Sequence, residues 1–178
     1  LQLIVKKHEF GLGSGFLHDL QSEQVIKARM MPNKDFNFPK KAKEVAMIFN
    51  GTGIAPFLGM IDENNKQIPL YLYGGFRHEN DWVKEYQKFA ESNMQKKKLI
   101  DYQFAYSRKI PGQYVMELIE KDAERFANLL RNNGCIMICG SLAMLRDVEN
   151  VLNHIVKERN GQPLSFYHDS KQILHDCY

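Results

Sequence analysis

The stretch 45–60, VAMIFNGTGIAPFLGM, constrains the fold more strongly than any other part of this chain. Its first five residues are apolar, as in a short strand that is buried on both faces. Gly51 and Gly53 then allow a sharp turn and a close approach to a ligand, because neither has a Cβ. Residues 54–60 read as a helix with Pro56 in its first turn, where a missing N–H costs little. The stretch therefore predicts a strand, a glycine turn and a helix N-terminus, which together favour binding of a phosphate.

This pattern alone does not decide between a ligand site and a plain connection. It reads G-x-G-x-x-P and lacks the third glycine of the dinucleotide fingerprint G-x-G-x-x-G. A tight strand-to-helix turn that binds nothing explains it equally well. The choice depends on what the other predicted strands end in.

Composition excludes several classes of protein. A chain of 178 residues can form one large domain or two small ones, and a net charge of +3 gives no argument for nucleic acid binding. There is no run of about 18 apolar residues that would span a membrane. The three cysteines, Cys135, Cys139 and Cys177, form neither an even disulfide framework nor closely spaced metal ligands. We therefore predict no metal site and a reducing, cytoplasmic location.

The first 40 residues carry weaker signals. We expect strands at 1–6 and 25–31 and a small antiparallel β segment that closes at 36–39. Between them, Gly11, Leu12, Gly13 and Ser14 precede a helical period, with Ser14 as the expected N-cap. This is a second candidate phosphate site, although a plain strand–turn–helix connection remains the alternative.

From residue 41 onward, strands and helices alternate. Linker composition at 39–43 places a domain boundary near residue 40. The expected strands are 45–50, 68–73, 99–106, 134–139 and 172–178, and the expected helices are 54–62, 80–92, 113–132 and 141–157. This alternation predicts an α/β fold, a mostly parallel sheet with helices on both faces. Ligands of such sheets bind beyond the carboxyl ends of the strands.

Polar or glycine-rich clusters follow the first four of these strands. They are Asn50-Gly51-Thr52-Gly53, Gly74-Gly75-Phe76-Arg77, Ser107-Arg108 and Cys139-Gly140-Ser141. Ser107 and Arg108 can bind a ribose 2′-phosphate, and Tyr114 can stack on adenine. A lone Ser-Arg pair is usually solvated surface. Its position at one sheet edge beside three other clusters favours a dinucleotide site.

The order of these motifs resembles that of the ferredoxin–NADP reductase superfamily, in particular its diflavin reductase branch of the sulfite reductase flavoprotein type. The matching motifs are GTGIAPF, Tyr73-Gly74-Gly75-Phe76-Arg77, Ser107-Arg108 with Tyr114, Cys139-Gly140 and the final Asp176-Cys177-Tyr178. The resemblance implies an NADP-binding domain over 41–178. It also implies that 1–40 is the C-terminal part of an antiparallel FAD-binding β-barrel.

The resemblance also implies an activity and a set of site residues. The implied function is an NADPH-dependent flavoprotein oxidoreductase, with hydride transfer from NADPH to FAD and onward single-electron transfer to a flavodoxin-like FMN domain or another carrier. Cys139, Asp176 and Tyr178 would lie at the hydride-transfer site, and Gly11, Leu12, Gly13 and Ser14 would hold the FAD pyrophosphate. The implied NADP contacts are Gly51, Thr52, Gly53, Pro56, Arg77, Ser107, Arg108, Tyr114, Gly140, Ser141 and Tyr178. Cys135 and Cys177 are expected to pack in the core.

Departures from the family pattern leave two alternatives open. The family's flavin-binding R-x-Y-S motif should precede Gly11, so we expect a piece of a longer protein that is inactive alone and lacks stoichiometric FAD. A membrane anchor outside this sequence is left open. Ser141 replaces the usual acid, and residues 112–116 replace the family's Lys-x-Tyr-x-Gln. The alternatives are an NADH-dependent single-flavin reductase and a nucleotide-binding regulatory module without redox chemistry.

Overall fold

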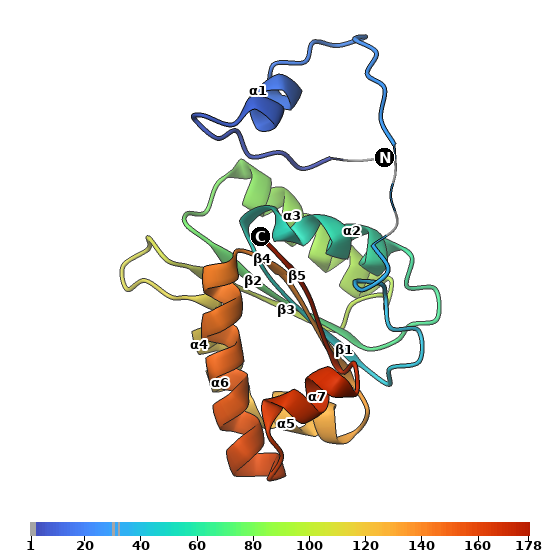
Figure 1. Cartoon of the computed structure of the whole chain (residues 1–178), viewed down its shortest axis with the longest axis vertical. Helices are drawn as coiled ribbons and strands as arrows, with labels where there is room; N and C mark the ends of the chain where they lie inside the picture. The colour runs from blue at the N-terminus through green and yellow to red at the C-terminus, as the bar shows by residue number, and fades with distance from the viewer. Residues whose placement is uncertain (1–2, 30, 32) are drawn as a thin grey trace. The chain divides into compact units, whose positions relative to one another are not determined.

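A computed structural model of the protein describes residues 3–29, 31 and 33–178. Internal contacts divide the chain into two units, Leu1–Lys34 and Asp35–Tyr178. All strands of the described residues lie in the second unit (Figure 1). The assignment of 1–40 to a flavin-binding domain and of 41–178 to an NADP-binding domain stays a prediction.

The second unit is built on one parallel sheet. Its strands are β1 (Val45–Asn50), β2 (Leu70–Phe76), β3 (Asp101–Tyr106), β4 (Cys135–Gly140) and β5 (Ile173–Cys177). They are ordered β3-β2-β1-β4-β5, and every neighbouring pair is parallel. The chain runs from β1 outward to β3 and then returns to place β4 on the other side of β1. The strand order therefore reverses between β1 and β4, and the predicted α/β fold is confirmed.

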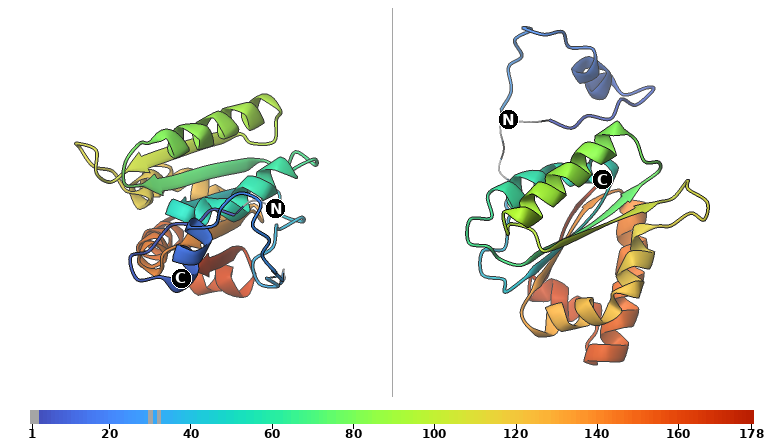
Figure 2. Two further views of the ribbon diagram at one scale, coloured as in Figure 1. Left: turned by 90° about the horizontal axis from the view of Figure 1, so that it is seen from above. Right: turned by 180° about the vertical axis from the view of Figure 1, so that it is seen from behind.

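Helices cover both faces of this sheet (Figures 1 and 2). One face carries α2 (Ala55–Asp62) and α3 (Asp81–Gln95); the other carries α4 (Val115–Lys121), α5 (Ala123–Arg131), α6 (Leu142–Asn160) and α7 (Leu164–Asp169). Side chains alternate between the faces of a strand, so Ile48 and Ile138 enter the core under α4–α7. Phe49 points the other way, and its ring lies 6.3 Å from that of Phe57 on α2.

Several predicted boundaries within this unit are wrong. The helix expected over 113–132 is two helices that meet at Asp122, whose backbone leaves the helical region. Its carboxylate accepts hydrogen bonds from the Tyr73 hydroxyl (2.8 Å) and from Gln103 Nε2 (2.7 Å), which ties this point to the sheet. Strands β2 and β4 extend further at their carboxyl ends than predicted, so that Gly74, Gly75 and Gly140 lie inside strands rather than after them. The short helix α7 was not predicted.

The strands predicted before residue 40 are also wrong. No residue of 3–29, 31 or 33–39 is in a strand, and the predictions for residues 1, 2 and 30 lie outside the described residues. An extended segment becomes a strand only when a neighbour pairs with it, and no antiparallel pair forms here. The antiparallel barrel segment is therefore absent from the described residues.

The helix α1 (Leu12–His18) begins earlier than predicted, with Gly11 rather than Ser14 at its N-cap. Ser14 lies inside the first turn, where its hydroxyl donates to the Gly11 carbonyl (3.2 Å) and accepts from the His8 N–H (3.1 Å). The hydroxyl is thus engaged by the preceding turn, which is why it does not cap the helix from outside.

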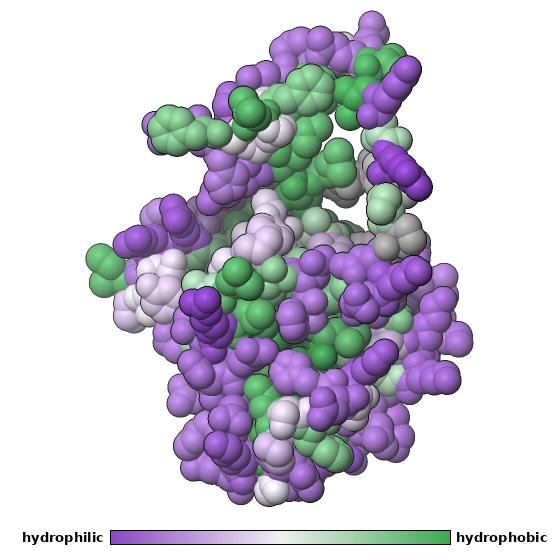
Figure 3. Space-filling model, viewed as in Figure 1, coloured by the Kyte–Doolittle hydropathy of each residue, from purple (hydrophilic) through white to green (hydrophobic). Residues whose placement is uncertain are grey.

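The two units differ in what they bury. No described side chain of the first unit is buried, and large apolar side chains such as Phe10, Leu12 and Val25 are more than nine-tenths exposed. Apolar side chains of this unit are visible on its surface in Figure 3. The first buried residue along the described chain is Phe36, whose ring lies 6.0 Å from that of Phe57. The core of the protein therefore starts at the beginning of the second unit.

Candidate functional site

The carboxyl ends of β1 and β4 meet where the strand order reverses. Strand β1 ends at Asn50 and continues into η1 (Gly51–Ile54), a tight helical turn that leads directly into α2. Strand β4 ends at Gly140, and Ser141 caps α6 by accepting a hydrogen bond from the Met144 N–H (3.3 Å). Two helical segments thus begin at neighbouring strand ends. In open parallel sheets this is the place where ligands bind.

Asn50 joins these two strand ends. Its Nδ2 donates to Ser141 Oγ (2.9 Å), and its Oδ1 accepts from the Ser141 N–H (2.9 Å). Because its amide is used in this way, Asn50 does not cap the turn η1, which has no side-chain cap. The first N–H groups of a helical turn have no partner within the turn. They are therefore available to an anion at this end of the sheet.

Two of the glycines are required by close approaches among η1, the end of β1 and β4. A Cβ on Gly53 would lie 2.1 Å from the Cys139 carbonyl oxygen, so no larger residue fits there. Gly140 has a φ of +147°, and a Cβ on it would lie 2.2 Å from Asn50 Oδ1. Gly51 differs, because an added Cβ would meet nothing within 4 Å and only its φ of +54° favours glycine. The face of the turn at Gly51 is therefore open.

The final residue, Tyr178, is bound to this same edge. Its backbone N–H donates to the Gly140 carbonyl (2.9 Å), and its carbonyl accepts from the Leu142 N–H (3.2 Å). Its hydroxyl lies 2.7 Å from Thr52 Oγ1 of η1. The side chain nevertheless remains 71% exposed. An aromatic residue at the end of a chain is usually solvated, but the structure attaches this tyrosine to the glycine turn.

Cys139 and Asp176 are register neighbours on β4 and β5, so their side chains project from the same face of the sheet. Cys139 is buried, and this burial, together with the nearby Asp176 and Cys177, raises the pKa of its thiol to about 12. The thiol is therefore neutral at physiological pH. Asp176 is exposed. As predicted, Cys135 is buried and Cys177 packs against the core.

The predicted cationic residues gather at the ends of β2 and β3. The ladder between these strands continues beyond their ends, with the Ser107 N–H bonded to the Phe76 carbonyl and the Arg108 N–H to the Arg77 carbonyl (both 2.9 Å). Arg77 and Arg108 are exposed, and within the described part of the chain neither guanidinium forms an ion pair. A guanidinium matches the geometry of a phosphate by two parallel hydrogen bonds.

Tyr114 lies at the N-cap of α4 with its side chain 54% exposed. Its N–H donates to Glu117 Oε1 (3.0 Å), and the following Val115 packs close to Gly75 of β2. The ring is thus held near the carboxyl end of β2 and is free to stack. Pro56 lies in the first turn of α2, as predicted.

The structure thus brings together Thr52, Gly53, Cys139, Gly140, Ser141 and Tyr178 by direct contacts or chain connection. It also joins the backbones of Arg77 and Arg108. The residues 11–14 belong to the other unit. The sequence analysis counted Asn50 in the cluster after the first strand but did not name it among the site residues. Its signal was a polar side chain placed directly between a buried strand and a glycine turn.

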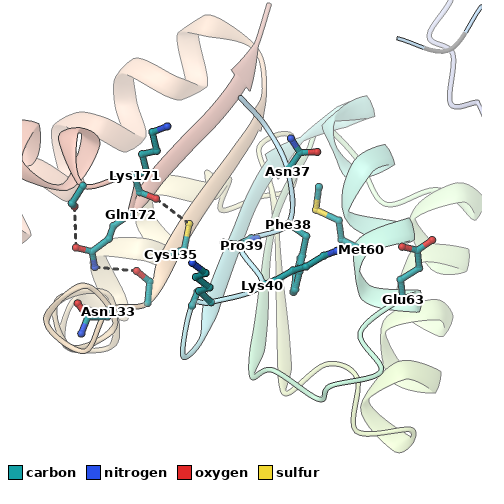
Figure 4. Close-up of a pocket in the computed structure, with 14 residues that line it drawn as sticks. Asn37, Phe38, Pro39, Lys40, Met60, Glu63, Asn133, Cys135, Lys171 and Gln172 are labelled. Atoms are coloured by element: carbon teal, nitrogen blue, oxygen red, sulfur yellow. Dashed lines mark hydrogen bonds between the residues drawn. The ribbon is translucent and has the colours of Figure 1, made fainter. Parts of the chain in front are cut away.

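A hollow at the opposite edge of the sheet lies away from these residues (Figure 4). It is lined by segments that precede β1, β4 and β5, including Lys40, Cys135 and Gln172. Gln172 Nε2 donates to the carbonyls of Leu130 (2.8 Å) and Gly134 (3.1 Å), so this lining group is satisfied by the protein itself. This hollow is not the predicted dinucleotide site.

The described residues contain no group of three or more His, Cys, Asp or Glu side chains placed to hold a metal ion. Nor do the described helices include one long and apolar enough to cross a membrane.

A parallel sheet with a strand-order reversal, a glycine turn and exposed guanidiniums at one edge defines a nucleotide-binding domain of the doubly wound α/β class. Residues 47–150, more than half of the chain, match the oxidoreductase NAD-binding domain family, and the chain belongs to this family.

Proteins of similar sequence include flavoproteins and reductases named for NADPH. The chain is 28% identical to the sulfite reductase (NADPH) flavoprotein alpha-component of Mannheimia succiniciproducens, over 93% of this chain and 28% of that protein. It is 34% identical to the NADPH–cytochrome P450 reductase of Bos taurus, over 71% of this chain and 20% of that protein. The predicted resemblance to the diflavin reductases is thereby confirmed. The chain spans less than a third of the length of these relatives.

Proposed function

We propose that this chain binds NADPH along the carboxyl edge of its sheet and serves an NADPH-dependent flavoprotein oxidoreductase. One observation carries the proposal: η1, the N-terminus of α6 and Tyr178 are joined at the strand-order reversal, at the sheet edge where Arg77 and Arg108 also follow their strands. The names of the relatives, which include NADPH and flavoprotein, support the choice of coenzyme and of reaction.

The residues at this edge fit NADP. The turn η1 has no side-chain cap, and neither η1 nor the first turn of α6 contains an acidic residue that would repel a phosphate. Gly51, Thr52 and Gly53 would hold the pyrophosphate, and Ser107 and Arg108, with Arg77 nearby, would hold the 2′-phosphate. Tyr114 would stack on the adenine.

The residues at the other end of the site suit the nicotinamide. When bound, NADPH would supply the hydride and FAD would accept it. Cys139 presents a neutral thiol, which excludes water from this end without adding a charge. The exposed carboxylate of Asp176, on the adjacent strand, is placed to stabilise positive charge that develops on the nicotinamide ring. The ring of Tyr178 would lie against the flavin.

This chain would supply only part of the FAD site. Helix α1 has neither a side-chain cap nor an acidic residue in its first turn, which suits a pyrophosphate at residues 11–14. We assign no residue before Gly11 to the isoalloxazine ring. We therefore expect the 178-residue chain to retain no stoichiometric FAD.

The electron acceptor and the cellular compartment are part of the same proposal. Onward transfer of single electrons would go to a flavodoxin-like FMN domain or to another carrier protein. We infer a cytoplasmic location for this segment, which the three free cysteines support.

Titration of 2′,5′-ADP and 5′-AMP into the protein and its Arg108→Ala variant tests the proposal. Loss of a charge-assisted hydrogen bond costs about 1.5–3 kcal/mol, so affinity for 2′,5′-ADP should fall about 10- to 150-fold. The affinity for 5′-AMP should not change, because 5′-AMP has no 2′-phosphate. Lys66→Ala removes the same charge from an exposed loop before β2 and is the matched control.

Three results would contradict parts of the proposal. Equal losses for the two ligands would show that Arg108 does not contact the 2′-phosphate. Equal affinity of the unaltered protein for both ligands would favour an NADH-dependent reductase. If neither ligand binds, the nucleotide site itself is wrong.

A further inference from the structure

The side chain of Tyr178 is held by a hydrogen bond rather than by packing. Its backbone continues the ladder of β5 through the bonds to Gly140 and Leu142, which fix the position of the Cα. The ring itself is largely exposed, so burial of apolar surface contributes little to its orientation. The contact that determines where the side chain points is the 2.7 Å hydrogen bond between its hydroxyl and Thr52 Oγ1.

The chemistry of the two hydroxyl groups favours one direction for this bond. Each hydroxyl has one proton and two acceptor lone pairs. A phenol is the more acidic of the two, so Tyr178 is the better donor and Thr52 the better acceptor. With its oxygen occupied in this way, Thr52 keeps its own proton for another acceptor. Donors and acceptors linked in such a chain strengthen one another.

Thr52 lies at the turn where we propose that a phosphate binds. It is the second residue of η1, half-buried beside the open face of Gly51 and within the turn that has no side-chain cap. A phosphate oxygen only accepts hydrogen bonds, so a phosphate at the turn requires Thr52 to donate.

We infer that Tyr178 is a positioning residue for coenzyme binding: its hydroxyl donates to Thr52 and thereby directs the Thr52 proton toward a phosphate at the glycine turn. This inference rests on the proposed function. It assigns to the tyrosine hydroxyl a role in binding that is separate from any role of the ring at the flavin. The last residue of the chain and the turn 126 positions earlier then act as one unit.

Tyr178→Phe removes the hydroxyl and keeps the ring, so it isolates this role. The 178-residue chain is titrated with NADP⁺, which places a pyrophosphate at the turn, and with 2′-AMP, which reaches only the Ser107–Arg108 end. We expect Tyr178→Phe to weaken NADP⁺ binding about 2- to 10-fold, the range of one hydrogen bond, and to leave 2′-AMP binding unchanged. Tyr102→Phe is the matched control, because it removes from β3 a tyrosine hydroxyl that donates to Glu91 of α3.

A double-mutant cycle shows whether the effect passes through Thr52. In the Thr52→Val background, Tyr178→Phe should have no further effect on NADP⁺ binding. In the Thr52→Ser background, which keeps a hydroxyl, the sensitivity to Tyr178→Phe should return. Thermal unfolding of each variant verifies that the fold is intact.

The outcomes separate this inference from the proposed function. If the unaltered protein binds 2′-AMP and NADP⁺ but Tyr178→Phe binds NADP⁺ equally well, the inference is wrong and the proposed function stands. Tighter NADP⁺ binding by Tyr178→Phe would also overturn it, because the bond would then compete with the coenzyme. If the unaltered protein binds neither ligand, both are wrong.

Discussion

At the scale of single residues, Asn50 links two elements of the candidate site. One amide joins the end of β1 to the N-cap of α6 through two hydrogen bonds. The same geometry excludes a Cβ at Gly140 and leaves η1 uncapped. Three features of the candidate site therefore depend on one side chain.

Variants of Asn50 separate structure from charge. Asn50→Ala removes both hydrogen bonds and leaves the Ser141 N–H without its partner, which should lower the free energy of unfolding by about 1–3 kcal/mol. Asn50→Asp keeps an oxygen that can accept from the Ser141 N–H and gains a second that can accept from the Ser141 hydroxyl, so it should lose less stability. Its added negative charge beside η1 should weaken NADP⁺ binding about 10-fold or more, as expected when a like charge faces a phosphate.

Urea unfolding and NADP⁺ titration of both variants measure these effects. Asn65→Ala, at an exposed position in the loop before β2, is the control for substitution of an asparagine. Unchanged stability of Asn50→Ala would show that the junction does not depend on this amide. Normal NADP⁺ binding by Asn50→Asp would place the pyrophosphate elsewhere.

At the scale of elements, the contact of η1 with β4 determines the shape of the site. Gly53 lies so close to the Cys139 carbonyl that the turn cannot move inward, and α2 continues directly from it. This rigid connection fixes the Thr52 hydroxyl relative to the strands. A more flexible turn would not hold the Thr52 hydroxyl in one direction.

Two glycine substitutions in consecutive segments test this tight contact. Gly53→Ala places a methyl group 2.1 Å from a backbone oxygen, so η1 and β4 must separate. We expect it to lower the free energy of unfolding by about 1–3 kcal/mol, as overpacking does. Gly59→Ala adds the same methyl group inside α2, where nothing lies within 4 Å. It should raise the free energy of unfolding by about 0.4–1 kcal/mol.

Chemical denaturation of both variants and the unaltered chain provides the comparison. The opposite signs matter more than the magnitudes, because both variants make the same change of residue. If Gly53→Ala is as stable as the unaltered protein, the turn does not pack on β4 as described.

At the scale of the whole molecule, the division into two units predicts which part folds alone. No described residue before Phe36 is buried, whereas Phe36 itself is 5% exposed and its ring packs near that of Phe57. The stable part should therefore begin close to residue 35.

Two truncated chains test this boundary. The chain 35–178 should unfold cooperatively with nearly the free energy of the full chain and should bind 2′,5′-ADP equally well. The chain 40–178 lacks the buried ring of Phe36 and should lose about 3 kcal/mol, the lower end of the cost of a phenylalanine deletion in a core. Phe36→Ala in the full chain should reproduce that loss. Equal stability of the two truncated chains would place the boundary nearer residue 40.

The sequence predicted the elements of the second unit because their patterns are local. Buried strands appear as apolar runs, helices as periodic stripes, and glycine turns as breaks between them. The parallel arrangement followed from their alternation, so the edge that carries the strand ends was also predictable. The break at Asp122 was not predictable, because its cause is a set of hydrogen bonds to β2 and β3. The strands predicted for the first unit do not form for a related reason, because a strand requires a neighbouring strand to pair with it.

The sequence by itself therefore determined the α/β fold, the family, and the residue types that surround a nucleotide at one edge of the sheet. Only the tertiary structure decided which of these residues touch. The bonds of Asn50 to Ser141 and of Thr52 to Tyr178 join positions 91 and 126 residues apart. No local pattern encodes such contacts, because they exist only after β4 and β5 have taken their places beside β1. Hydrogen bonds act over about 3 Å, so a site of this kind is specified by packing and not by spacing along the chain.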